Sequence, residues 1–171
     1  MKLSKSLYTR AIQCQKSLWL KKHNKDVLTP PNAAAQAIFQ NGNEVGDLAC
    51  KLFPNGVEIP YLNTTFQDKI NLTQEYINQG TQNIYEATFE FDGILIMIDI
   101  LNIKDNSVMI NEVKSSTQVK DIYLHDASIQ YYVLNGLGYD VKKVNIIHIN
   151  NEYVRDEELD INQLFSVVDV T

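Results

Sequence analysis

Two strongly apolar segments joined by a short polar turn, each carrying one carboxylate, constrain the fold of this chain more than any other feature. The stretch from residue 96 to 115 reads IMIDILNIKDNSVMINEVKS. Its many isoleucine and valine residues predict two strands, and KDNS predicts a turn because Asn106 tolerates a positive φ. A buried carboxylate is unfavourable unless its charge is compensated, so Asp99 and Glu112 require an explanation.

The position of the turn sets the expected pairing of the two strands. A hairpin centred on Asp105 and Asn106 makes Asp99 face Glu112, with their Cα atoms about 4.5–5.5 Å apart. Lys114 lies on the same face as Glu112 because strand side chains alternate. A divalent cation would remove the repulsion between the two carboxylates, and such oxygen ligands suit Mg²⁺ or Mn²⁺. A loop of odd length would instead send Asp99 to the opposite face.

The rest of the chain predicts an α/β domain. Helices are expected over 4–23, 32–52, 66–78 and 120–138, and Trp19 is expected in the core. Strands are expected over 57–62, 82–91, 93–103, 107–116 and 142–150, of which the first is an edge strand because it contains Pro60. The order predicts one domain over 1–171 with a mixed sheet and helices packed on it. The last residues, LFSVVDVT, read as a further strand without a polar tail, so we expect the chain to be a piece of a longer protein.

Composition excludes several classes of protein. Apolar residues make up 44% of the chain, yet no window holds the ~20 apolar residues of a membrane helix. The N-terminus has no signal-peptide core, which predicts a cytoplasmic protein without a membrane partner. The net charge of −6 argues against binding nucleic acid by charge alone, although a local basic groove is compatible with it. Cys14 and Cys50 form no C-x-x-C pair.

The order of the segments YEATFEF, GILIMIDI, INEVKSS and ASIQYYVL resembles the PD-(D/E)XK nuclease superfamily, in particular its RecB-like branch with the CRISPR-associated exonucleases. The resemblance implies a restriction-endonuclease-like mixed sheet flanked by helices. It also implies Mg- or Mn-dependent hydrolysis of phosphodiester bonds in DNA, for repair, recombination or defence. Matching positions imply that Glu86, Asp99 and Glu112 are metal ligands. Lys114 would orient the water or stabilise the reacting phosphorus, and Gln130 would arrange the site.

The chain departs from that pattern at three places. Gly46 stands where the RecB-like branch often has a metal-binding histidine, and Leu134 stands where a tyrosine is common, with Tyr131 and Tyr132 nearby. Cys14, in CQKSLWL, resembles the first ligand of an iron–sulfur cluster. Either that cluster is lost or a missing C-terminal part supplies the other three cysteines, and a buried apolar thiol is the alternative interpretation. These departures leave open a catalytically inactive nuclease-fold module that binds DNA or a protein partner.

Each candidate residue also has a structural interpretation. Asp99 could be satisfied by backbone donors. Glu112 and Lys114 could form a simple ion pair on a solvated face of the sheet. Gln130 and Glu86 could be ordinary solvated residues on their helix and strand.

Overall fold

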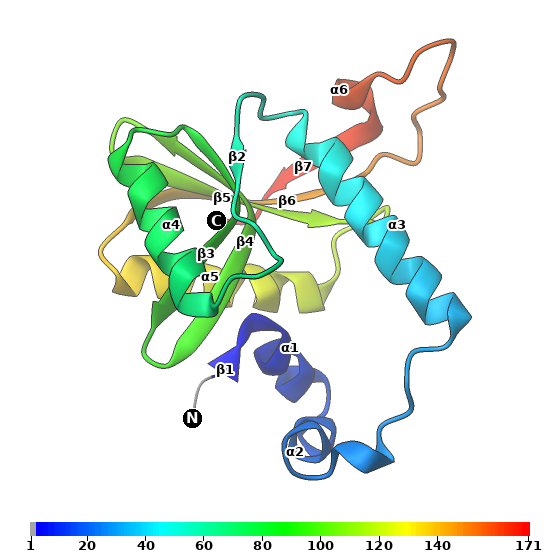
Figure 1. The fold of residues 1–171 in the computed structure, drawn as a ribbon. Coiled ribbons are helices and arrows are strands. Elements are labelled where there is room, and N and C mark those ends of the chain that lie inside the picture. The colour runs from blue at the N-terminus through cyan, green and yellow to red at the C-terminus, as the bar shows by residue number, and fades with distance from the viewer. Residues whose placement is uncertain (1–2) are drawn as a thin grey trace.

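The computed structural model describes residues 3–171 as an α/β fold with an open, mixed sheet of seven strands flanked by helices (Figure 1). Its elements are β1 (Leu3–Ser4), α1 (Lys5–Gln13), α2 (Gln15–His23), the 3₁₀ helix η1 (Lys25–Val27), α3 (Ala33–Cys50), β2 (Val57–Glu58), α4 (Phe66–Asn78), β3 (Asn83–Phe91), β4 (Ile94–Lys104), β5 (Ser107–Lys114), α5 (Asp121–Gly136), β6 (Asp140–Ile149), α6 (Ile161–Leu164) and β7 (Phe165–Asp169). Within these residues, none of the helices combines the length and the apolar character needed to cross a membrane.

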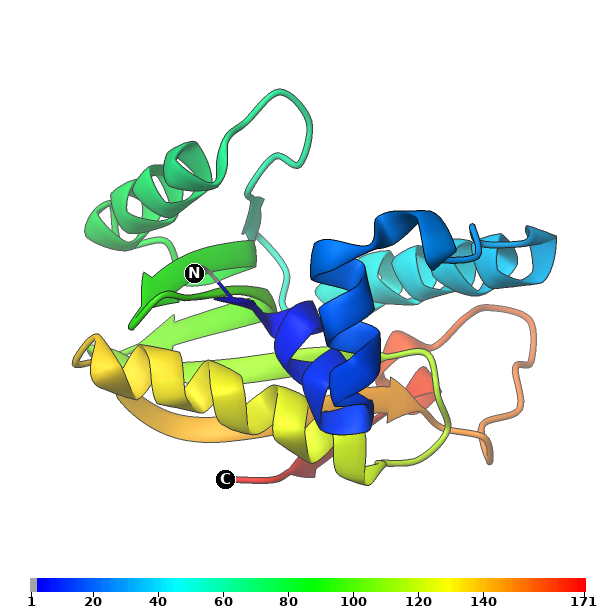
Figure 2. The same ribbon diagram turned by 90° about the horizontal axis from the view of Figure 1, so that it is seen from below.

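Strand β4 is apolar on both faces because it lies in the middle of the sheet. The strands follow the order β2-β3-β4-β5-β6-β7. Ile96, Ile98, Ile100 and Leu101 are all fully buried. Figure 2 shows why both faces are covered: α3 and α4 lie on one side of the sheet and α5 lies on the other. A strand in this position can carry a nearly continuous apolar run.

The hairpin between β4 and β5 has the predicted register. Lys104 pairs with Ser107, and the pairing continues to Ile100 opposite Asn111. Both turn residues adopt positive φ, 50° at Asp105 and 63° at Asn106. Two left-handed residues are the signature of a two-residue type I′ turn, whose twist matches that of the strands it joins. The turn therefore fixes which residues of β4 and β5 face each other.

Helix α5 is the crossover between the parallel strands β5 and β6. β6 pairs with β5 in parallel, with Glu112 opposite Ile146, and β7 then pairs with β6 in the antiparallel direction. Because α5 begins soon after β5 ends, the first turns of α5 lie beside the carboxyl end of β5. Polar residues from these two elements can therefore meet at the carboxyl end of β5.

Strands β4 and β5 separate at Asp99, and β1 with the first residue of α1 lies in the fork between them. Their pairing ends at Ile100 and Asn111, although β5 continues to pair with β6 as far as Lys114. The first two residues of β4 pair instead with β1, which places Leu3 opposite Ile94 and Ser4 opposite Leu95. Lys5, the first residue of α1, follows β1 directly. The fork thus brings the start of the chain next to Asp99.

The N-terminal region differs from the sequence prediction. A single helix over 4–23 is wrong, because Cys14 is extended (φ −164°, ψ 106°) and separates α1 from α2. The predicted burial of Trp19 is also wrong: the residue is 57% exposed and lies against His23, with 5.3 Å between ring centroids. The extended residue reorients α2, and no residue of α2 is buried. By contrast, α4 has the predicted bounds and begins with a capping box between Thr65 and Asp68.

Replacing Asn106 by valine is expected to lower the free energy of unfolding by about 1–3 kcal/mol, because a β-branched residue is strained in left-handed backbone. Asn106→Gly is the matched control and should keep or raise the stability, since glycine adopts that conformation freely. Urea denaturation monitored by circular dichroism measures both variants. Equal stability of the two would contradict the assigned turn.

Candidate functional site

Glu112 is the centre of a polar site at the fork. It lies near the end of β5 and is only 2% exposed. Nζ of Lys114 donates to its Oε1 at 2.6 Å, and Nε2 of Gln130, on α5, donates to its Oε2 at 2.7 Å. Nζ of Lys5 lies 3.0 and 2.9 Å from the same two oxygens. The hydrogen-bonding capacity of this carboxylate is therefore filled by two ammonium groups and an amide.

The side chain of Asp99 takes part in the separation of β4 from β5. Its Oδ2 accepts the backbone N–H of Val113 at 2.7 Å. If the ladder continued in the same register, that N–H would bond the carbonyl oxygen of Ile98. The carboxylate thus replaces a backbone acceptor at the fork. This is a contact of the kind that the structural interpretation of Asp99 expected.

Glu86 extends the acidic site onto a third strand. Tyr85 pairs with Ile100 and Ala87 pairs with Ile98, so Glu86 lies in the same row of the sheet as Asp99. The backbone of Glu86 is left-handed, with φ 58°. A residue other than glycine in this conformation is unfavourable by about 1–3 kcal/mol, and such residues concentrate at functional sites.

Two residues of the site were missed by the sequence analysis. Asp126, on α5, is 6% exposed, and its Oδ2 accepts from Nζ of Lys114 at 2.6 Å. Its Oδ1 lies 3.7 Å from Nζ of Lys5 and has no hydrogen-bond partner. Asp126 precedes Gln130 by one helical turn, a spacing that puts both on one face and could have revealed it. Lys5 gave no local signal, because only the fold brings it here.

We refer to six residues as the carboxylate–lysine cluster: Glu86, Asp99, Glu112, Asp126, Lys5 and Lys114. Burial raises the pKa of Asp99 to about 7, and the neighbouring charge of Glu112 acts in the same direction. Burial alone would also raise the pKa of Glu112, but Lys5 and Lys114 hold it well below its usual value. Burial opposes the charged form of both lysines, yet the carboxylates raise the pKa of each. Glu112 and the two lysines are therefore charged at neutral pH.

The cluster has more acidic than basic groups. Burial raises the pKa of Glu86 and of Asp126, and the charge of Glu112 reinforces the increase. Lys5 acts in the opposite direction on both, together with Lys69 at Glu86 and Lys114 at Asp126. Within the cluster, two ammonium groups thus face four carboxyl groups, and the buried Lys69 adds a positive charge near Glu86 only. Carboxyl groups whose pKa is raised in this way are ones that a further cation would help to ionise.

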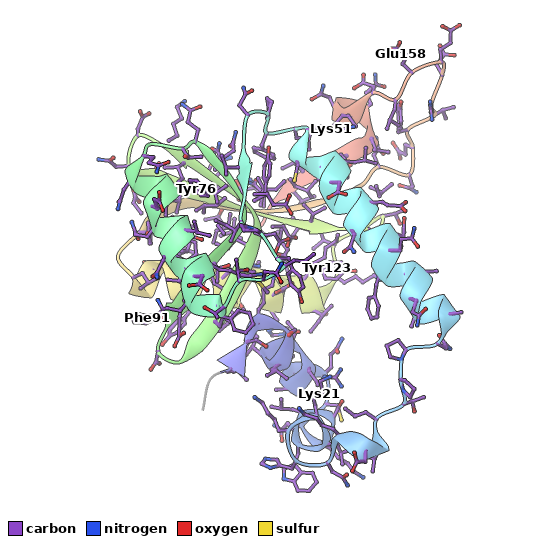
Figure 3. The ribbon with its side chains drawn as sticks, in the orientation of Figure 1. Lys21, Lys51, Tyr76, Phe91, Tyr123 and Glu158 are labelled. Carbon is purple, nitrogen blue, oxygen red and sulfur yellow. The ribbon has the colours of Figure 1, made fainter. Side chains whose placement is uncertain are left out.

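The remaining predicted positions lie around the cluster. Gln130 is fully buried and also donates from Nε2 to the backbone oxygen of Asp126 at 3.2 Å, while its Oε1 has no partner. Leu134 is a core residue. No heavy atom lies within 4 Å of the position that a Cβ would take at Gly46, so α3 has room for a side chain there. The centroid of the ring of Tyr123, labelled in Figure 3, lies 5.2 Å from Nζ of Lys114.

The two cysteines differ in their surroundings. Cys14 is exposed between α1 and α2, so its interpretation as a buried apolar thiol is wrong. Cys50 is half-buried, and burial, together with the charges of Asp47 and Glu58, raises its pKa to about 12. A thiol with so high a pKa stays protonated and is a poor nucleophile.

The donor chemistry of the cluster suits a hard cation, but its arrangement does not present an open site. Among residues 3–171, no group of three or more histidine, cysteine, aspartate and glutamate side chains is placed to hold a metal ion. The oxygens of Glu112 are engaged by Lys5, Lys114 and Gln130. Carboxylate oxygens are nevertheless what Mg²⁺ and Mn²⁺ prefer, and the unpartnered Oδ1 of Asp126 points to incomplete compensation.

No protein-family model matches the chain, and no curated protein matches it. Function must therefore be inferred from the chemistry of the site and from the order of the sequence motifs.

In metal-free buffer, Asp99→Asn is expected to stabilise the protein, and more so at about pH 8 than at about pH 5. The folded-state pKa of Asp99 is about 7 and the ordinary value is 3.8, so between them the folded state holds a proton that the unfolded chain lacks. The stability that this proton contributes is present below pH ~4 and lost as the pH rises through ~7. Asparagine mimics the neutral acid and still accepts from Val113, so the advantage of the variant grows to about 1–3 kcal/mol.

Urea denaturation in the presence of a chelator gives the free energies of unfolding of Asp99→Asn and the wild type. A variant that is less stable than the wild type at both pH values would show that Asp99 is a purely structural acceptor.

Proposed function

We propose that this protein is a metal-dependent nuclease that hydrolyses phosphodiester bonds in DNA. The observation that carries the proposal is the contact network of Glu112 with Lys114 and Gln130, beside Asp99 on the neighbouring strand. Three separate sequence segments supply these residues, in the order that the PD-(D/E)XK resemblance implies. If the acidic–lysine pattern of β5 were a coincidence, the amide of Gln130 on α5 would not be expected to donate to Glu112 as well.

The arrangement of the strands supports a restriction-endonuclease-like fold. The acidic residues lie on an antiparallel hairpin, β4 and β5, which is followed by a helical crossover to the parallel strand β6. The two strands of the hairpin separate at Asp99, so the carboxylates lie where the ladder between β4 and β5 ends. Residues carried by strands of a packed sheet are held more rigidly than residues on loops, as a catalytic site requires.

Each residue has a chemical role in this proposal. Asp99 and Glu112, with Glu86, would hold Mg²⁺ or Mn²⁺; when bound, such an ion lowers the pKa of a water and neutralises charge on the scissile phosphate. Lys114 keeps its proton between Glu112 and Asp126 and can orient the attacking water or stabilise developing negative charge. Gln130 fixes the orientation of Glu112.

A second candidate function is a catalytically inactive module of the same fold that binds DNA or a protein partner. Two observations favour it: Gly46 supplies no metal-binding side chain, and the oxygens of Glu112 are engaged by lysines. An iron–sulfur cluster in a longer form of the protein is a separate proposal. The exposed thiol of Cys14 is accessible to such a cluster, but the other three cysteine ligands would have to come from outside this chain.

Metal binding separates the two candidates without an activity assay. Millimolar Mn²⁺ or Mg²⁺ is expected to raise the melting temperature of the wild type, because a ligand that binds only the folded state stabilises it. Asp99→Asn should lose most of this response. Differential scanning fluorimetry measures both, with Asp105→Asn, a change of the same kind at the exposed hairpin turn, as the control. An unresponsive wild type would favour the binding module.

Cleavage of DNA tests the catalytic proposal directly. With Mn²⁺ and labelled single- or double-stranded DNA, Lys114→Ala is expected to lower the cleavage rate by about 10²-fold or more, as for the loss of other charge-stabilising donors. Lys104→Ala removes an exposed lysine at the tip of the same hairpin and should retain full activity. Equal rates for the wild type and Lys114→Ala would remove the nuclease assignment.

A further inference from the structure

Lys5 is the member of the cluster to which the proposed function gives no role. Its Nζ is 2.9 Å from one oxygen of Glu112 and 3.0 Å from the other, and 3.7 Å from Oδ1 of Asp126. Its side chain is 18% exposed. An ammonium group that bridges both oxygens of one carboxylate, with a second carboxylate beside it, stands where a cation ligated by these residues would stand.

The position of Lys5 is determined by the fold rather than by a loose chain end. Leu3 donates its N–H to the carbonyl of Gly93 at 2.8 Å, and Ser4 pairs with Leu95 on β4. The hydroxyl of Ser4 then caps α1 by accepting the N–H of Leu7. Lys5 is therefore attached to the same strand that carries Asp99, on the side of the fork that β5 leaves open.

A single ammonium charge compensates the site only in part. Lys5 and Lys114 face four carboxyl groups, and Oδ1 of Asp126 is buried without a hydrogen bond. A divalent ion in place of the Lys5 ammonium would bring twice the charge and could accept an oxygen ligand from Asp126. The contacts of Lys5 and a divalent ion on Glu112 are mutually exclusive, because both need the same oxygens.

We propose that the ammonium group of Lys5 occupies the cation position of this site when no divalent ion is bound, and that Mg²⁺ or Mn²⁺ binds by displacing it. The identity of the ion rests on the proposed function. Ion binding and the docking of the Lys5 side chain are then linked equilibria. The apparent ion affinity of the wild type is lowered by the free energy needed to release Lys5 from Glu112.

The direct test is the affinity for Mn²⁺, measured by isothermal titration calorimetry. Lys5→Met keeps most of the aliphatic side chain and removes the competing charge, so it should bind Mn²⁺ about tenfold more tightly than the wild type. Lys16→Met removes the same charge from an exposed position on the neighbouring helix α2 and should bind like the wild type. The comparison with Lys16→Met separates competition for the site from a change in net charge.

A second measurement uses the unchanged protein, and so does not depend on whether Lys5→Met folds. Lys5 should react slowly with an amine-acylating reagent in the absence of divalent ions and several-fold faster with saturating Mn²⁺. Peptide mass spectrometry gives the rate at Lys5, with Lys16 as an internal reference that should not change.

The outcomes separate this inference from the proposed nuclease. Tighter binding by Lys5→Met, or binding by that variant alone, supports the displacement of Lys5 even if no DNA is cleaved. If the wild type binds Mn²⁺, Lys5→Met binds it equally or more weakly, and the acylation rate of Lys5 is unchanged, the displacement of Lys5 is overturned. The proposal of a metal-dependent nuclease is not affected by that result. Absence of Mn²⁺ binding in both proteins overturns both proposals.

Discussion

The structure depends on how the charge of Glu112 is compensated inside the sheet. This carboxylate lies on a central strand and is almost inaccessible to water, and three donors from three different elements surround it. Removing any one of them would leave a buried charge incompletely paired, which is strongly unfavourable. The N-terminal strand and helix, the hairpin and the crossover helix α5 are therefore tied together at this point by polar contacts. The apolar core around them sets the positions from which these contacts are made.

The irregularities of the sheet occur where the acidic residues lie. β4 leaves β5 after Ile100, the side chain of Asp99 takes over a backbone hydrogen bond, and Glu86 in the same row adopts a left-handed φ of 58°. Each of these features opposes stability, since a regular ladder with apolar side chains would be more favourable. Strain and shifted pKa values that coincide in this way are typical of functional sites, because a merely structural sheet gains nothing from them.

Local patterns predicted much of this arrangement. The turn residues Asp105 and Asn106 determine the hairpin, and the hairpin register in turn predicted that Asp99 and Glu112 would be neighbours. Lys5 could not be predicted in the same way, because its place depends on a two-residue strand pairing between distant parts of the chain, which leaves no periodicity in the sequence. Trp19 was misassigned for a related reason: one extended residue, Cys14, redirects the helix that carries it. The part of Asp126 in the site could have been predicted from its spacing of four residues from Gln130.

The excess of carboxyl groups also constrains the order in which ligands can bind. Without a divalent ion, the cluster presents four carboxyl groups against two lysines, on a chain with a net charge of −6. To the extent that these carboxyl groups are ionised, they would repel a phosphodiester, and the two ammonium groups are already engaged by Glu112 and Asp126. A divalent ion bound as proposed would make the potential at the site less negative, and Lys5, released from Glu112, would then be free to meet a phosphate. Under either proposed function, the same electrostatics would require that a cation bind before the nucleic acid.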